Sequence, residues 1–201
     1  CIDEIISSSQ KIESFSIIAP ISNSIEYQNY KLGKNHVYDN NNAFKVKSVD
    51  GYAMLLNLKK LNQLQFFDDH KYFDENFFMY LENDDLCKRL IDCGENIYVA
   101  PYSKIKHLGA KSVDDKYKDE IELSRNWHWV WSKFYYNKKH FGFFSALLNG
   151  LPSFVSASIK FLFYSLIINR KKSKIYLNRI NGFLNALLGK KSSYRPNLNK
   201  N

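Results

Sequence analysis

Short apolar runs constrain the fold of this chain most strongly. Residues 14–21 read SFSIIAPI and residues 96–101 read NIYVAP, and both runs are interrupted or ended by proline. In residues 44–47, Phe44 and Val46 alternate with lysines. Runs of these kinds are typical of buried and half-buried β-strands that lead into loops. The sequence therefore predicts a sheet built from short strands.

A helix is predicted between two of these strands. From Leu86 to Cys93 the apolar positions follow helical spacing, and Gly94 is a suitable residue to end the helix. The order strand, helix, strand indicates an α/β fold. In such folds ligands usually bind where strands end and helices begin.

Acidic residues are concentrated at the start of that helix. Residues 73–94, FDENFFMYLENDDLCKRLIDCG, hold six carboxylates, and Glu82, Asp84 and Asp85 fall within four positions. Crowded carboxylates repel one another, which favours proton uptake by one of them, and such a group can act as a general base. An ordinary acidic helix N-terminus, favoured by the helix dipole, explains the same pattern. The spacing alone leaves both interpretations open.

Three further features are candidates for a binding site. His107 follows the strand at 96–101, and carboxylates with an imidazole can hold Mg or Mn beside a phosphate, although a lone histidine is more often structural. The stretch WHWVWSKFYY (127–136) offers flat rings for sugars, or equally the packed face of a helix. Gly51 precedes a second apolar run and indicates a tight turn or a close backbone approach.

The charge divides the chain into an acidic and a basic portion. Residues 1–124 hold 15 Lys and Arg against 20 Asp and Glu, a balance of −5. Residues 125–201 hold 14 Lys and Arg and no acid, a balance of +14, which completes the net charge of +9. A reversal of this kind indicates a basic, aromatic tail with an anionic partner.

The tail carries two apolar segments. In residues 141–168, the charge-free part from Phe141 to Ile159 approaches the ~20 residues that a membrane-spanning helix needs. Asn149, Gly150 and Pro152 are expected to break it, so an interfacial position is predicted. Residues 174–191 predict a basic helix with one apolar face, which suits a membrane surface or packing on the domain. The segment 22–43, rich in Asn, Lys and Tyr, is predicted to be an exposed loop. Cys87 and Cys93 are expected to be buried thiols in a reducing compartment.

Four motifs together resemble bacterial family 2 glycosyltransferases of the rhamnosyltransferase-like kind. They read VDGYAMLL, FDENFFMYLENDDLCKRL, GENIYVAPYSKIKHLGAKS and RNWHWVWSKFYYNKKHFG, and the resemblance covers roughly residues 1–142. It implies a GT-A fold with a mixed sheet and inverting transfer of a sugar, with rhamnose one candidate, from a nucleotide donor to a growing surface glycan. A divalent metal, Mg or Mn, is expected from the resemblance.

The resemblance also implies roles for individual residues. The family's acidic motif supplies the base that deprotonates the acceptor, and its usual Glu-Asp-x-Asp-Leu reads Glu-Asn-Asp-Asp-Leu from Glu82 to Leu86, with an amide in the second place. Glu82 or Asp85 is therefore the expected base, with Asp84 as a further contributor. His107 matches the family's metal ligand, and Ser112 matches the serine that follows it, without an assigned role. Gly51, Tyr80 and Trp127 are the residues expected to bind the acceptor.

The domain organisation follows from the same comparison of motifs. Residues 1–140 are predicted to be the acceptor-binding, catalytic half of a GT-A domain, and residues 141–201 a basic helical tail that binds an anionic membrane surface. The family's nucleotide-binding βαβ units and Asp-x-Asp motif are not found in the sequence, and Cys1 begins what resembles the helix after that motif. The chain is therefore expected to be part of a longer enzyme and to bind a nucleotide sugar poorly by itself.

The predicted enzyme is peripheral on the cytoplasmic face of the membrane and acts on a glycan or a lipid-linked acceptor. Two alternatives stay open: a non-catalytic module that binds membranes or nucleic acid, and a degenerate transferase half kept as a scaffold. Nucleic acid is not expected as a partner of the transferase, and the binding module leaves the acidic cluster and His107 unexplained. The amide at Asn83 makes the scaffold credible.

Overall fold

The structure is a computed structural model that describes residues 2–24, 27–33, 43–64, 71–107 and 114–197. It combines 54% helix with a mixed sheet, which confirms the α/β class. The chain divides into two compact units. One unit, the sheet unit, holds residues 1–74 and 82–109, and the other, the helical unit, holds residues 75–81 and 110–201.

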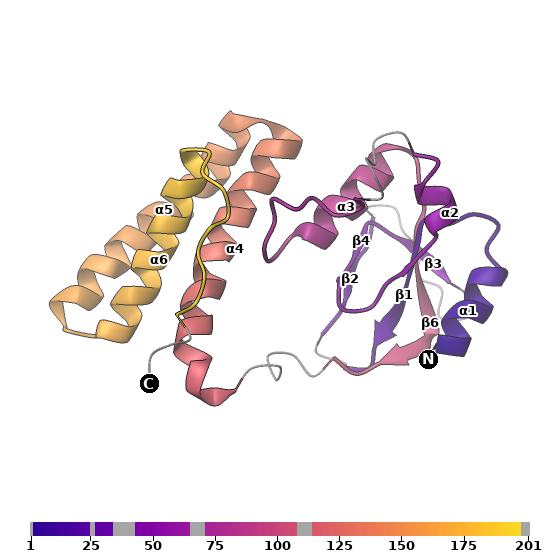
Figure 1. Cartoon of the computed structure of the whole chain (residues 1–201), viewed down its shortest axis with the longest axis horizontal. Helices are drawn as coiled ribbons and strands as arrows, with labels where there is room; N and C mark the ends of the chain where they lie inside the picture. Colours follow the sequence, from indigo (N-terminus) through magenta and orange to yellow (C-terminus); the bar gives the residue numbers. More distant parts are fainter. Residues whose placement is uncertain (1, 25–26, 34–42, 65–70, 108–113, 198–201) are drawn as a thin grey trace. The chain divides into compact units, whose positions relative to one another are not determined.

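A four-stranded sheet forms the centre of the sheet unit (Figure 1). Its strands, in the spatial order β3-β6-β1-β5, are β1 (Ile17–Ser22), β3 (Phe44–Val46), β5 (Leu55–Leu56) and β6 (Ile97–Ile105). The pair β1–β6 is parallel, whereas β3 and β5 are antiparallel to their neighbours. A separate antiparallel pair joins β2 (Tyr30–Lys31) to β4 (Ser48–Val49). The strands predicted from the apolar runs are thereby confirmed.

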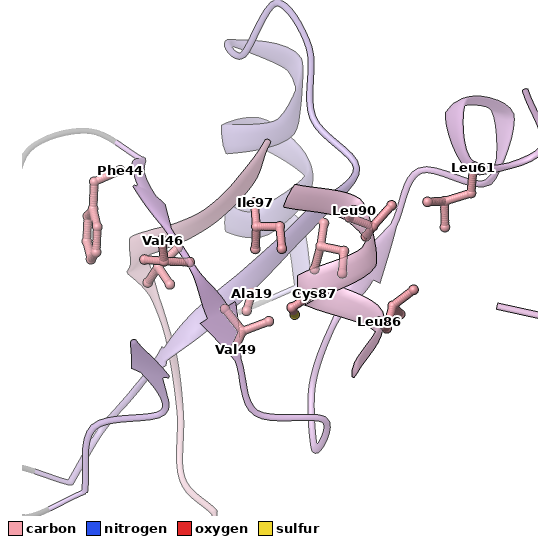
Figure 2. Close-up of a cluster of buried hydrophobic side chains, with 11 residues drawn as sticks. Ala19, Phe44, Val46, Val49, Leu61, Leu86, Cys87, Leu90 and Ile97 are labelled. Carbon is pink, nitrogen blue, oxygen red and sulfur yellow. The ribbon is translucent and has the colours of Figure 1, made fainter. Parts of the chain in front are cut away.

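Helices cover both faces of this sheet. They are α1 (Ile2–Gln10), α2 (Leu58–Leu61) and α3 (Glu82–Asp92). Alternate side chains of a strand point to opposite faces, so Ile17 and Ala19 share a core with α3, whereas Ile18 packs with Ile5 of α1. Figure 2 shows three residues of α3 directed into the first core: Leu86, Cys87 and Leu90.

The predicted helix end at Gly94 is confirmed. Gly94 has a φ of 79°, and the amides of Gly94 and Glu95 donate to the carbonyls of Ile91 and Leu90, both at 3.0 Å. This left-handed residue closes the helix in the manner that favours glycine.

Two predictions for the sheet unit are wrong in part. The expected exposed loop contains β2 and the fully buried Asn29, because backbone pairing with β4 and side-chain hydrogen bonds compensate its polar composition. Cys87 is fully buried as expected, and burial raises the pKa of its thiol to about 12. Cys93 is exposed, because the helix rotates it away from the core that Cys87 enters.

The helical unit is built from three long helices that pack side by side (Figure 1). A short 3₁₀ turn (Asp115–Tyr117) precedes α4 (Lys118–Phe141), α5 (Phe143–Leu166) and α6 (Arg170–Leu187). The predicted break in the first apolar segment of the tail is wrong, since α5 runs through Pro152 without interruption. A Cβ at Gly150 would lie 2.5 Å from Phe183 Cε2, so this glycine permits close contact with α6 rather than a break.

The boundary of the units differs from the predicted one at residue 140. Helix α4 belongs with α5 and α6, because Trp127, Trp131 and Phe134 share a core with Ala146 and Phe183. Residues 75–81 also belong to the helical unit. The basic tail is therefore two helices of a three-helix unit and not a separate appendage.

Candidate functional site

The acidic cluster occupies the first turn of α3, and two of its three carboxylates have a cationic partner. Lys31 Nζ lies 2.8 Å from Asp84 Oδ1, and Arg89 Nε lies 2.9 Å from Asp85 Oδ2. Asp85 is fully buried, and Arg89 also donates to the carbonyl of Tyr72 at 2.6 Å. Both aspartates therefore have their charge compensated by a neighbouring cation.

Glu82 differs from the two aspartates. Its Oε2 atom is buried and has no hydrogen-bond partner among the residues that the structure describes. A buried carboxylate oxygen without a donor is costly, and such atoms in native proteins call for an explanation such as a substrate proton. Of the two expected bases, Glu82 therefore has the better geometry, whereas Asp85 is tied to Arg89.

The turn at residues 50–52 connects the acidic helix to His107. On one side, a Cβ at Gly51 would lie 3.3 Å from Asn83 Cβ, and Asn83 Nδ2 donates to the Val49 carbonyl at 2.8 Å. On the other side, the Tyr52 ring stacks on His107 with 4.3 Å between centroids and 7° between planes. The fold thus brings Gly51, the start of α3 and His107 to the same turn, although they are far apart in sequence.

A tyrosine and a carboxylate complete the surroundings of His107. The Tyr27 hydroxyl donates to Asp50 Oδ2, and the Tyr27 ring lies 6.3 Å from the His107 ring. Partial burial and the hydrogen bond to Asp50 raise the pKa of Tyr27 well above its usual value. Partial burial likewise raises the pKa of Tyr52. Both phenols stay protonated at neutral pH and serve as neutral donors and flat ring surfaces.

An open pocket of about 500 Å³ adjoins Tyr27 at the carboxyl ends of β1 and β6. Its lining is mostly polar and aromatic: Ser22, Asn23, Gln28, Tyr30, Tyr102 and Lys104. Asn29 fixes one wall, because its Nδ2 donates to the Pro20 carbonyl and its Oδ1 accepts from the Ser22 amide, both at 2.8 Å. Polar side chains with aromatic rings suit a hydroxyl-rich ligand.

The metal expected from the resemblance has one candidate ligand here. His107 is exposed, and Asp50, which accepts a hydrogen bond from the neighbouring Tyr27, is a carboxylate of the same group. Among the described residues, no group of three or more His, Cys, Asp or Glu could hold a metal ion. These residues by themselves do not fit a complete metal site. Ser112 lies outside the described residues.

The remaining acceptor-binding candidates belong to the helical unit. Trp127 is only 3% exposed and stacks with Trp131 and Tyr194, whereas Trp129 is 45% exposed. Tyr80 has a φ of 70° and packs edge-on against Trp129 at 5.5 Å. The accessible ring of this aromatic stretch is therefore Trp129, which the sequence did not single out.

The aromatics beside the acidic cluster pack on α4. Phe77 contacts Tyr135 at 4.9 Å between ring centroids, Phe78 contacts His128 at 4.8 Å, and Ser132 Oγ donates to the Met79 carbonyl at 2.7 Å. These side chains anchor the segment that leads into α3. This explains why large aromatic residues precede the carboxylates.

Sequence reasoning missed Tyr27, Asn29, Tyr52 and Trp129. Tyr27 and Asn29 lie in a segment whose polar composition resembles an ordinary loop, and Tyr52 opens the apolar run that follows Gly51. No local pattern marks these three as site residues. Trp129 lies in the helix as an exposed position between two buried tryptophans, a difference that helical spacing could have indicated. Comparisons of the chain with models of known protein families, with curated proteins and with solved structures found no match.

Proposed function

We propose that the chain carries the catalytic base and the acceptor site of an inverting glycosyltransferase. The observation that carries this proposal is the meeting of Gly51, the acidic turn of α3 and His107 around one turn of the sheet unit. These are the motifs that resemble family 2 glycosyltransferases. The buried Oε2 of Glu82, which has no hydrogen-bond partner within the described ranges, supplies a proton acceptor at that place.

In the proposed reaction Glu82 Oε2 takes the proton of an acceptor hydroxyl. The hydroxyl oxygen then bonds to the anomeric carbon of the donor sugar from the side opposite the nucleotide. The bond from that carbon to the nucleotide diphosphate breaks, and its electron pair leaves with the diphosphate. Asp84 and Asp85, held by Lys31 and Arg89, keep the turn that carries Glu82 in place.

A divalent metal, when bound, would stabilise the charge of the departing diphosphate. His107 would be its protein ligand in the described part of the chain, with the remaining ligands coming from the diphosphate or from residues outside that part. The Tyr52 ring holds the imidazole in its stacked orientation. The polar pocket beside Tyr27 is the proposed place for a sugar of the acceptor.

Substituting the proposed base tests this function. The assay uses the gene product that contains this chain, with any residues that its reading frame adds, and measures nucleotide diphosphate release across a panel of nucleotide sugars and glycan acceptors. Glu82→Gln should lower the transfer rate about 10²- to 10⁴-fold without unfolding the protein, since general-base catalysis contributes that much. Glu75→Gln, at an exposed acid of the same stretch, is the matched control. Transfer at the normal rate by Glu82→Gln would refute the assignment.

A non-catalytic membrane-surface protein is the second candidate. It is favoured by α5, whose outward side chains form an apolar stripe with few buried neighbours. Among the described residues, α5 is the helix long and apolar enough to cross a membrane by length and composition, and 11% of its most apolar part is buried. Vesicle binding together with unchanged behaviour of Glu82→Gln would favour this candidate. The transferase proposal includes the same stripe as its attachment to the cytoplasmic face of the membrane.

A further inference from the structure

A cationic pocket in the helical unit continues into an apolar groove. The pocket, of about 220 Å³, is lined by Tyr80, Arg125, Asn126, Trp129 and Arg179. A narrower space of about 70 Å³ shares Trp129 and Arg179 with it and runs between α4, α5 and α6. Both spaces lie within one compact unit.

The two arginines of this pocket have no acidic partner among the described residues. Arg179 Nε donates to Asn126 Oδ1 at 2.7 Å, and Asn126 Nδ2 donates to the Glu122 carbonyl at 2.8 Å. The Arg179 guanidinium also lies 5.7 Å from the centre of the Tyr176 ring. The carboxylate of Glu122, one turn before Arg125, lies 3.5 Å from Lys171 Nζ. One guanidinium is thus held in place, and both have donors to spare for an anion.

The aromatic wall of the pocket is built at a conformational cost. Tyr80 and Leu81 have φ values of 70° and 67°, a region that side chains with a Cβ rarely adopt. Consecutive residues of this kind persist where the surroundings fix them, and they cluster at ligand sites. Here the Tyr80 ring lies edge-on against Trp129, and both rings line the pocket together with the arginines.

The adjoining groove is apolar at its base. Phe134, Ala146 and Phe183 are buried there, and the Phe183 ring packs so closely on Gly150 that a Cβ at this position would lie 2.5 Å from Cε2. Polar residues line the rim of the groove: Lys133, Asn137, Asn149 and Ser153. A paired cationic head site that leads into an apolar slot matches a ligand with an anionic end and a hydrocarbon chain.

We propose that this groove binds the phosphate end of a lipid phosphate, with Arg125 and Arg179 on the phosphate and the first part of the chain against Phe183. The absence of any acid from residues 125–201 supports an anionic occupant. As the lipid carrier of the acceptor glycan, this ligand rests on the proposed function. Its binding does not depend on catalysis and is measured separately.

Trp129 provides the readout, because the other two tryptophans of the chain are buried. Dodecyl phosphate, kept below its micelle-forming concentration, should change the intrinsic fluorescence in a saturable way, and Trp129→Phe should remove most of the change.

Arg125→Gln should weaken binding about tenfold or more, as expected for a lost charged hydrogen bond. Arg179→Gln would remove the hydrogen bond to Asn126, whereas Arg125→Gln removes no described hydrogen bond. Arg125→Gln is therefore the variant that should keep the fold. Arg170→Gln, an exposed arginine of α6 outside the pocket, should bind as the normal protein does.

Two ligand controls separate the parts of the proposal. Inorganic phosphate should bind far more weakly than dodecyl phosphate, and dodecyl maltoside should not compete. Equal binding of inorganic phosphate would reduce the groove to a simple anion site, and unchanged binding by Arg125→Gln would overturn the assignment. Glu82→Gln should bind dodecyl phosphate normally. If the protein binds dodecyl phosphate but transfers no sugar, the proposed function has failed. If it transfers sugar but does not bind dodecyl phosphate in the groove, the groove proposal has failed.

Discussion

Asn83 shows how one side chain fixes the approach of two segments. Its amide donates to the Val49 carbonyl at 2.8 Å while its Cβ faces Gly51. An aspartate at this position could accept but could not donate this hydrogen bond at neutral pH. The amide of Asn83 therefore has a structural role in the sheet unit.

Replacing this amide by a carboxylate should destabilise the sheet unit. Asn83→Asp would introduce one negative charge, which would lie beside the Val49 carbonyl oxygen and next to Asp84 in the chain. We expect the free energy of unfolding to fall by about 1–3 kcal/mol, the cost of an unsatisfied buried group. Urea unfolding followed by circular dichroism measures this. Asn23→Asp, at an exposed asparagine of the same unit, makes the same charge change, and equal stability of the two variants would contradict the prediction.

At the scale of elements, glycines are expected to disfavour helix, but in the structure those of α5 and α6 permit close packing between helices. The sequence predicted that Gly150 and Pro152 would break the first apolar segment of the tail, because both residues disfavour helix interiors. Instead, Gly150 permits Phe183 to approach α5, and a Cβ at Gly182 would lie 2.5 Å from the Trp127 carbonyl oxygen of α4. Helix–helix packing outweighs intrinsic propensity here, and no local pattern carries that information.

Gly182→Ala distinguishes packing from propensity. Propensity alone predicts that alanine stabilises α6 by up to about 1 kcal/mol. Packing predicts the opposite sign, because the new Cβ meets backbone that cannot rotate away, and overpacking costs about 1–3 kcal/mol. We expect a lower thermal midpoint for Gly182→Ala. Asn181→Ala, at the neighbouring exposed position, controls for propensity, and a raised midpoint for both variants would refute the packing account.

A buried histidine connects α4 to the segment that follows α6. His128 Nε2 lies 2.9 Å from the Tyr194 carbonyl, so this nitrogen carries hydrogen and donates, and Nδ1 accepts from Ser192 Oγ at 2.9 Å. Burial, with a smaller contribution from Arg195, lowers the pKa of His128 below its usual value, although the Tyr194 carbonyl opposes the shift. The neutral imidazole is therefore the form that the folded helical unit holds.

The stability of the helical unit should consequently fall in mild acid. Below pH about 6.5 the histidine of the unfolded chain binds a proton that the folded chain does not yet bind. This proton binding stabilises the unfolded state relative to the folded state, so the free energy of unfolding falls. The loss begins near that pH and continues until the lowered pKa of the folded state is reached. Urea unfolding at pH 7.5, 6.5 and 5.5 measures the slope. His128→Gln, whose amide can still donate to Tyr194, should show a smaller slope, and an equal slope would assign the effect to other groups.

Other parts of these elements were predictable because their signals are local. Apolar runs predicted β1 and β6, and the helical spacing with Gly94 predicted α3 and its end. The neighbourhood of Gly51, Asn83 and His107 was not predictable from local patterns, since their contacts depend on tertiary folding. The stacking of Tyr52 on His107 had no local signal at all.

At the scale of the whole molecule, charge and apolar surface are combined in one unit. Exposed apolar side chains follow α5 at spacings of three and four residues: Phe144, Leu148, Leu151, Val155, Ile159, Leu162 and Leu166. This stripe extends about 33 Å along the helix at 1.5 Å per residue. The opposite face packs on α4 and α6 through Ala146 and Ala157. A helix with one face packed on protein and the opposite apolar face exposed is suited to lie in a membrane interface.

The last prediction concerns attachment to a membrane. A triple variant, Leu148→Ser, Val155→Ser and Leu162→Ser, should lose co-sedimentation with phosphatidylglycerol vesicles by about a hundredfold or more. Each such side chain contributes about 1.5–3 kcal/mol when it leaves water completely, and Leu148, Val155 and Leu162 are 72%, 50% and 61% exposed. The normal protein should bind zwitterionic vesicles more weakly, because basic residues near an anionic surface add about 1 kcal/mol each.

A matched control separates membrane attachment from general surface hydrophobicity. Ile6→Ser, Leu58→Ser and Ile91→Ser remove three exposed apolar side chains from the sheet unit, and this variant should sediment as the normal protein does. Equal losses in both triple variants would show that α5 has no special part. A normal protein that stays in solution with vesicles but forms a dimer, which the α5 variant abolishes, would assign the stripe to a second copy of the chain. Suppose that only the α5 variant loses sedimentation and that added salt weakens sedimentation only in part. Both the apolar stripe and the basic charge then hold the protein at the membrane surface.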